Sequence, residues 1–184
     1  IGGSGARCRC LRVLVTDPAA QSDSIGSGNV KWGGEMAGLD GRTHRSQEDS
    51  CVCPLGISSP ALGHTGPNRL FFGEQHTATD YYYRDEIEEL RTDGILTELD
   101  LAFSRDQSAK VYVQDRMRER GALLWEWLQN GAHFYVCGDA TRMAKNVDEA
   151  LCGVVAEHGK LAPRSAEAYV KALAAEKRYV RDVY

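Results

Sequence analysis

The chain contains 184 residues, with six cysteines, a formal net charge of −4 and no block of basic residues. Its length is sufficient for one domain with a buried core, or for one domain and an appendage. The acidic balance argues against nucleic acid or an anionic membrane as the main partner. Because no apolar run approaches a membrane span and the first residues lack the apolar core of a signal peptide, we expect a cytoplasmic protein.

Residues 1–60 are rich in Gly, Ser, Arg and Asp and show little periodicity, and only Leu11–Thr16 has the pattern of a strand. Four cysteines here form two C-x-C pairs that invite a zinc interpretation: Cys8, Cys10, Cys51 and Cys53. This spacing lies outside the common zinc motifs, so we predict no metal site and expect disordered or poorly organised chain. The remaining cysteines, Cys137 and Cys152, fall in a predicted strand and a predicted helix and are expected as free thiols.

From residue 67 onward, apolar strand patterns alternate with helical ones. Predicted strands cover 69–73, 95–103 and 133–137, and predicted helices cover 81–91, 115–128, 142–158 and 165–177. Asp80 is expected to cap the first of these helices. Strands that alternate with helices of this length are typical of a parallel sheet covered on both faces. The sequence therefore predicts an α/β, doubly wound fold with a mostly parallel sheet.

The stretch from His133 to Lys145 reads as a buried strand, a tight turn at Gly138 and a helix N-terminus that Asp139 can cap. A ligand at that turn would meet backbone N–H groups and the helix dipole. Cys137 would lie at the carboxyl end of the strand, where open α/β sheets bind their ligands. The alternative is an ordinary strand–helix turn with a core cysteine.

A second polar group follows the predicted strand 95–103. Two cations, a hydroxyl and a phenol occur within a few residues of one another: Ser104, Arg105, Lys110 and Tyr112. Arginine offers a planar fork and lysine a point charge to a phosphate monoester, while the two hydroxyls donate hydrogen bonds. In a Rossmann-like domain such a site distinguishes NADP from NAD by its 2′-phosphate. The alternative is a solvated charged loop.

Six ordered motifs across residues 61–184 resemble the NADP-binding domain of the diflavin reductases, which belong to the ferredoxin–NADP reductase superfamily. The motifs are Leu70–Gly73, Ala102–Gln107, Lys110–Gln114, Tyr135–Ala140, Arg142–Lys145 and Arg178–Tyr184. The C-terminal Arg-Asp-Val-Tyr looks most like the flavoprotein component of NADPH-dependent assimilatory sulfite reductases. The resemblance implies an NADPH-dependent flavoprotein oxidoreductase, of which this chain carries the NADP-binding domain, at 61–184.

The resemblance also assigns roles to individual residues. It implies that Ser104, Arg105, Lys110 and Tyr112 hold the 2′-phosphate, with Gln114 a weaker candidate nearby. It implies that Asp139 and Met143 line the nicotinamide ribose and that Cys137 and Asp182 flank the nicotinamide itself. Tyr184 would stack on the FAD ring and move aside to admit the nicotinamide. Hydride would pass from NADPH to FAD, and electrons would continue through FMN to an iron–sulfur or haem partner.

The sequence also departs from this family. Members begin the domain with a strand and a glycine-rich pyrophosphate loop, which nothing in residues 1–60 matches; the FAD and FMN domains are absent from this chain. Our hypothesis is that residues 1–60 are not native family sequence. The isolated chain is expected to be inactive, and the alternative function is a catalytically silent nucleotide-binding fragment. Because the missing strand belongs at the centre of the sheet, we expect Leu11–Thr16 to take its place.

Overall fold

A computed structural model describes residues 11–16, 66–138 and 143–183 of the chain. Within these ranges, the first two strands are β1 (Leu11–Thr16) and β2 (Asn68–Glu74), followed by the helices α1 (Thr77–Asp80) and α2 (Arg84–Thr92). The order continues with β3 (Glu98–Phe103), α3 (Val113–Glu119), α4 (Gly121–Gln129), β4 (His133–Gly138), α5 (Met143–His158), α6 (Pro163–Ala175) and β5 (Tyr179–Val183).

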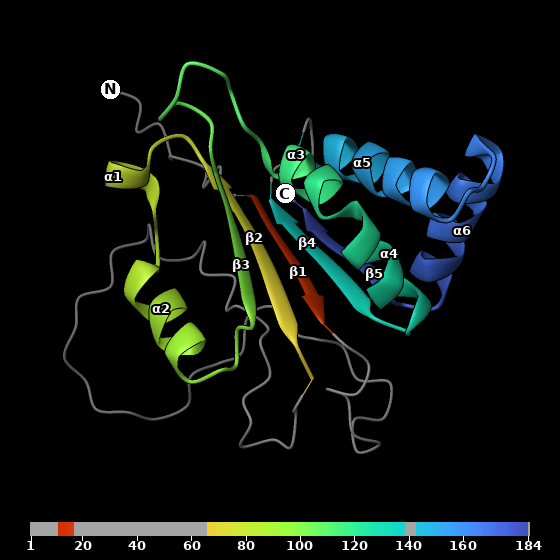
Figure 1. Cartoon of the computed structure of the whole chain (residues 1–184), viewed down its shortest axis with the longest axis horizontal. Coiled ribbons are helices and arrows are strands. Elements are labelled where there is room, and N and C mark those ends of the chain that lie inside the picture. Colours follow the sequence, from red (N-terminus) through yellow and green to blue (C-terminus); the bar gives the residue numbers. More distant parts are fainter. Residues whose placement is uncertain (1–10, 17–65, 139–142, 184) are drawn as a thin grey trace, which may run out of the picture.

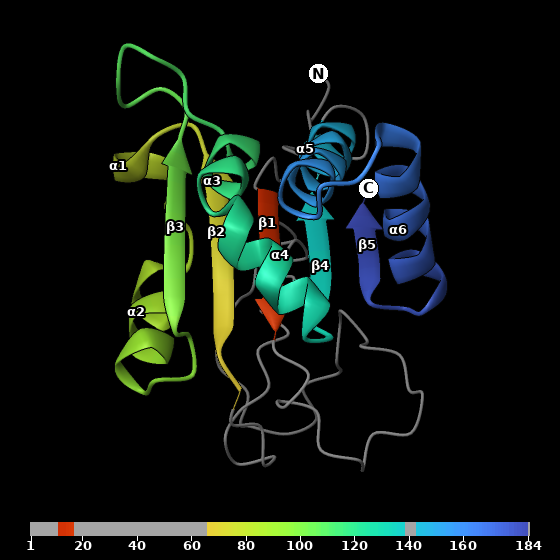
Figure 2. The same ribbon diagram turned by 45° about the vertical axis from the view of Figure 1, so that its right-hand side comes forward.

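The five strands form one open sheet in the order β3-β2-β1-β4-β5. Helix α2 lies on one face, whereas α3, α4 and α5 lie on the other, with α6 beside β5 (Figures 1 and 2). The predicted α/β fold is therefore confirmed, and Leu11–Thr16 occupies the central position expected for it.

The direction of β1 differs from the expected parallel arrangement. β2 pairs with β3 and β4 pairs with β5 in parallel, but β1 runs antiparallel to both of its neighbours. Arg12 lies opposite Phe72 and Cys137, near the ends of their strands, while Thr16 lies opposite Asn68 and His133, where those strands begin. The sheet is consequently mixed. The chain leaves β1 at the amino ends of β2 and β4, not at their carboxyl ends.

Two hydrophobic clusters cover the two faces of the sheet. The larger one combines Val13 and Val15 of β1 with Phe71, Phe134 and residues of α3 to α6. The smaller one combines Leu70 and Phe72 with Ile87 of α2 and Leu96. The alternation of side chains along each strand divides these residues between the clusters, because neighbouring side chains point to opposite faces.

Two helix boundaries differ from those predicted. The first long helix begins at Arg84, directly after Tyr83, which has a φ of 61°. Asp80 does not cap this helix as predicted; its carboxylate accepts a hydrogen bond from the His76 amide at 2.9 Å. The predicted helix 115–128 is divided into α3 and α4 at Arg120. At this break Gly121 approaches α5 so closely that a Cβ atom would lie 2.4 Å from His158 Nε2.

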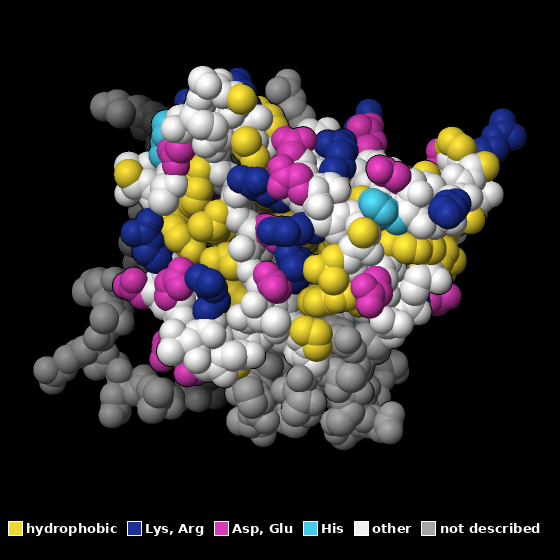
Figure 3. Space-filling view, viewed as in Figure 1, with side chains coloured by type: hydrophobic (Ala, Val, Ile, Leu, Met, Phe, Trp, Pro, Cys, Tyr) yellow, Lys and Arg dark blue, Asp and Glu magenta, His cyan; other side chains and the backbone are white. Residues whose placement is uncertain are grey.

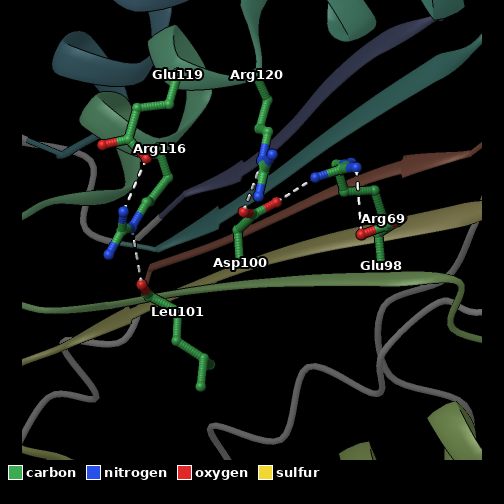
Figure 4. A network of polar contacts seen from close by, with 7 residues as sticks. All are labelled: Arg69, Glu98, Asp100, Leu101, Arg116, Glu119 and Arg120. Atoms are coloured by element: carbon green, nitrogen blue, oxygen red, sulfur yellow. Dashed lines mark hydrogen bonds and ion pairs between the residues drawn. The ribbon is translucent and has the colours of Figure 1, made fainter.

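A network of charged side chains joins the amino ends of β2 and β3 to α3 and α4 (Figure 4). The buried Asp100 carboxylate contacts the buried Arg69 guanidinium, and Arg120 Nε donates to Asp100 Oδ1 at 3.1 Å. Arg69 also lies 3.5 Å from Glu98, whose side chain is half-exposed. The Arg116 Nε donates to the Leu101 carbonyl at 3.1 Å, which fixes α3 against β3.

Replacement of Asp100 by alanine is predicted to lower the free energy of unfolding by about 3–5 kcal/mol, because Arg69 would remain buried without its main counter-charge. Glu98→Ala serves as the matched control. Its partner is the same arginine, but the carboxylate is 51% exposed, so the loss should not exceed about 1 kcal/mol. Urea unfolding of both variants measures the difference, and equal losses would contradict the predicted importance of burial.

A second prediction follows from the central position of β1 and concerns hydrogen exchange. The amides of residues 11–16 should exchange as slowly as those of residues 134–136, because both sets are buried in the middle of the sheet. The amides of residues 106–109, which are exposed, provide the fast-exchanging reference within the same sample. Fast exchange across residues 11–16 would show that β1 does not fill the slot in solution.

Candidate nucleotide-binding site

The candidate site lies at the carboxyl ends of β2 and β3, on the loop that connects β3 to α3. Beyond the strands, the pairing continues with hydrogen bonds from the Ser104 amide to the Glu74 carbonyl, at 2.8 Å, and from the Arg105 amide to the Gln75 carbonyl, at 2.9 Å. Gln107 Nε2 donates to the Phe103 carbonyl at 2.7 Å and closes the turn. The first residues of the loop are thus held in place by the sheet.

Three aromatic rings lie beneath these loop residues. The ring centroid of Phe72 lies 5.4 Å from that of Tyr81 and 6.2 Å from that of Phe103, and Tyr81 and Phe103 are 5.5 Å apart. Burial raises the pKa of the Tyr81 phenol above its ordinary value, so this phenol is neutral and serves packing. Tilted and edge-on rings at such distances stabilise one another, which gives the loop a firm base.

The predicted 2′-phosphate residues are distributed along this single connection. Ser104 is half-buried at its start, whereas Arg105 and Lys110 are exposed. Neither cation forms an ion pair within the described part of the chain. Tyr112, 41% exposed, is the residue before α3, and its amide donates to Asp115 Oδ2 at 2.9 Å. Gln114 follows in the first turn of α3. The loop therefore presents two uncompensated cations and two hydroxyl groups to solvent.

The predicted nicotinamide residues are placed on neighbouring strands. Cys137 and Asp182 are register partners in the parallel pair of β4 and β5, so their backbones are adjacent. Gly138 then ends β4 with a φ of 156°, a conformation that favours glycine. Met143 is the first residue of α5 and packs against the larger cluster. Asp139, Tyr184 and the side chain of Asp182 lie outside the described residues.

Free thiols were predicted for Cys137 and Cys152, and this prediction is wrong for Cys137. Cys152 is free, and burial raises the pKa of its thiol. Cys137, which is buried at the end of β4, is disulfide-bonded. A thiol role for Cys137 beside a nicotinamide would require the reduced form. The C-x-C cysteines of the zinc interpretation lie outside the described residues, and no metal-binding group was found in the described part of the chain.

One cluster of polar residues next to the loop was not predicted from the sequence. Asp106 accepts hydrogen bonds from the amide of Thr77, at 2.9 Å, and from its hydroxyl. His76 Nδ1 lies 3.2 Å from Asp106 Oδ1. The available signal was the position of His76 and Thr77 directly after the predicted strand 69–73, since loops that follow adjacent parallel strands meet at one edge of the sheet.

Ion pairs occupy part of the remaining charged surface. Cationic and anionic side chains alternate over the face formed by α3 and α4 (Figure 3). Arg116 pairs with Glu119 at 2.8 Å and Arg118 with Asp115 at 3.1 Å. A groove between α5, α6 and β5 lies on a different side of the molecule from the candidate loop. None of the described helices combines the length and apolar character needed to cross a membrane.

Comparison with known proteins agrees with this arrangement of sheet and loops. Residues 44–149, more than half of the chain, match the family described as the oxidoreductase NAD-binding domain. The chain belongs to this family, and its sheet is an α/β sheet of the ferredoxin–NADP reductase type.

The similar proteins define the group more narrowly. The chain is 55% identical over 119 residues to the sulfite reductase [NADPH] flavoprotein alpha-component of Mannheimia succiniciproducens, a match that covers 65% of this chain and 20% of that protein. It is 53% identical over 124 residues to the protein of the same name from Cronobacter sakazakii, covering 67% of this chain and 21% of the relative. The chain thus spans about a fifth of the length of these relatives.

Proposed function

We propose that this chain carries the NADPH-binding segment of a flavoprotein reductase, and that residues 61–184 constitute its NADP-binding domain. The observation that carries the proposal is the loop from Ser104 to Tyr112. It presents two uncompensated cations at the carboxyl end of a strand, in a chain similar to NADPH-dependent flavoproteins over 119 residues.

The donor set of this loop fits a 2′-phosphorylated adenosine. Arg105 and Lys110 form no ion pair with any residue that the structure describes, so binding a phosphate would break none of the ion pairs seen there. Charge-assisted hydrogen bonds to phosphate are stronger than neutral ones. Ser104 and Tyr112 would donate to the remaining phosphate oxygens, Gln114 would contribute from the first turn of α3, and the guanidinium of Arg105 would lie over the adenine.

The nicotinamide end would lie at β4 and β5. NADPH supplies the hydride when bound, and a flavin accepts it. The adjacent backbones of Cys137 and Asp182 favour a site in which both side chains, with Cys137 in its reduced form, hold the nicotinamide against the flavin. Asp139 and Met143 would line its ribose, and Tyr184 would cover the FAD ring when no nicotinamide is present.

The partners follow from the same proposal. FAD and FMN would be bound by other domains of the parent protein, and electrons would pass to an iron–sulfur or haem reductase component. Sulfite is the favoured final acceptor because of the relatives named above, and nitrate is the second choice. The site of this reaction would be the cytoplasm.

A catalytically silent nucleotide-binding fragment is the second candidate function. It is favoured by the direction of β1, because Thr16, the last residue of β1, lies at the amino ends of the neighbouring strands. A pyrophosphate loop that follows the central strand would have to lie at the opposite edge. Flavin absorbance of the purified chain, and ferricyanide reduction driven by NADPH, separate the two candidates. We expect little FAD and little turnover from the isolated chain, and turnover from a chain joined to its FAD domain. No turnover in that joined protein would favour the silent fragment.

Arg105→Ala and Lys110→Ala should each weaken NADP binding by about 1.5–3 kcal/mol, the value of one hydrogen bond to a charged group. NAD binding should change much less, because NAD has no 2′-phosphate and would lose only the contact of Arg105 with the adenine. Isothermal titration of both cofactors measures the difference. Arg91→Ala is the control, since it removes the same charge from an exposed side chain of α2 that pairs with Glu88. Equal losses for NADP and NAD would contradict the assignment.

A further inference from the structure

In the loop that carries Arg105, one link to the loop after β2 is made by a side chain, that of Asp106, and not by the backbone. Ser104 and Arg105 extend the pairing of β2 and β3 through their own amides. At the next residue, Asp106, the loop between β3 and α3 accepts hydrogen bonds in place of donating them. The Asp106 carboxylate accepts from both the amide and the hydroxyl of Thr77. The carboxylate thus adds one more link between the two loops beyond the end of the sheet.

The surroundings of Asp106 stabilise its charged form. The Thr77 hydroxyl and the Thr77 amide hold the pKa of this carboxyl below its ordinary value. His76 contacts the other carboxylate oxygen at 3.2 Å. The loop that supplies these donors is itself fixed, because the His76 amide donates to Asp80 at 2.9 Å. Asp106 therefore joins two ordered loops.

An acidic side chain beside a phosphate site requires a reason. The charge of Asp106 would repel a 2′-phosphate held by the adjacent Arg105, so Coulomb interactions alone favour a neutral residue at this position. A role in holding the loop explains a carboxylate, because it offers acceptors to three donors at once. The two roles predict opposite effects when the side chain is removed.

We propose that Asp106 is a positioning residue for 2′-phosphate recognition: by accepting hydrogen bonds from Thr77 and contacting His76, it holds Arg105 in the orientation that binds the phosphate. This inference rests on the proposed function of the loop. Asp106 itself does not contact the nucleotide. Its removal releases the loop from residues 76–77 and leaves the backbone hydrogen bonds of Ser104 to Glu74 and of Arg105 to Gln75 in place.

The test compares Asp106→Ala with the nearly isosteric Asp106→Asn in the full chain, using isothermal titration with 2′,5′-ADP and with 5′-AMP. Asp106→Ala should weaken 2′,5′-ADP binding about tenfold, the equivalent of 1.4 kcal/mol, and leave 5′-AMP binding unchanged. Asp106→Asn keeps an acceptor for Thr77 and removes the charge, so its 2′,5′-ADP affinity should equal or exceed that of the unaltered chain. Asp85→Ala, which removes an exposed acid from α2, should have no effect.

Unchanged or tighter 2′,5′-ADP binding in Asp106→Ala would overturn the inference, as would an equal loss in Asp106→Asn. Failure of the unaltered chain to bind 2′,5′-ADP would instead overturn the proposed function. Hydrogen exchange at the Arg105 amide tests the positioning role without any ligand. Faster exchange in Asp106→Ala but not in Asp106→Asn supports the role, and unchanged exchange in both variants overturns it.

Discussion

The structure depends on the pairing of two facing strand edges at the centre of the sheet. β2 and β4 each carry backbone N–H and C=O groups toward the position between them, and these groups need hydrogen-bond partners because the flanking residues are buried. β1 satisfies both edges. Its Val13 and Val15 then complete the cluster on which α3, α4 and α5 pack. A strand of either direction meets this requirement, which explains how an antiparallel β1 supports an otherwise parallel arrangement.

Charged side chains are paired differently at the two ends of β2 and β3. At the amino ends of β2 and β3, buried charges are paired with one another, as in the contact between Arg69 and Asp100. At the carboxyl ends, the exposed cations Arg105 and Lys110 have no ion pair within the described residues, although the backbone beneath Arg105 is firmly held. This contrast favours the proposed binding at the second edge, since uncompensated charges on an ordered loop are ready to receive a phosphate.

Much of this arrangement follows from sequence patterns, and the exceptions have physical causes. Strand alternation correctly places Leu11–Thr16 in the centre, but it does not give the direction of the strand, because a period of two reads the same both ways. The break at Arg120 interrupts an unbroken helical pattern, since close contact of Gly121 with α5 outweighs local propensity. The proposed phosphate loop was predicted from its residue types and stays a prediction. The hydrogen bonds of Asp106 were not predicted, because its donors, His76 and Thr77, come from a loop that is distant in sequence.

We propose that the loop between β3 and α3 recognises the 2′-phosphate of an adenosine nucleotide. The most direct test is to add 2′,5′-ADP to the isotopically labelled chain and to follow its backbone amide resonances by NMR. We predict that the shifts concentrate in residues 74–77 and 104–114, and that 5′-AMP produces much smaller shifts there. Shifts of equal size with both nucleotides, or shifts confined to α5 and α6, would contradict the claim.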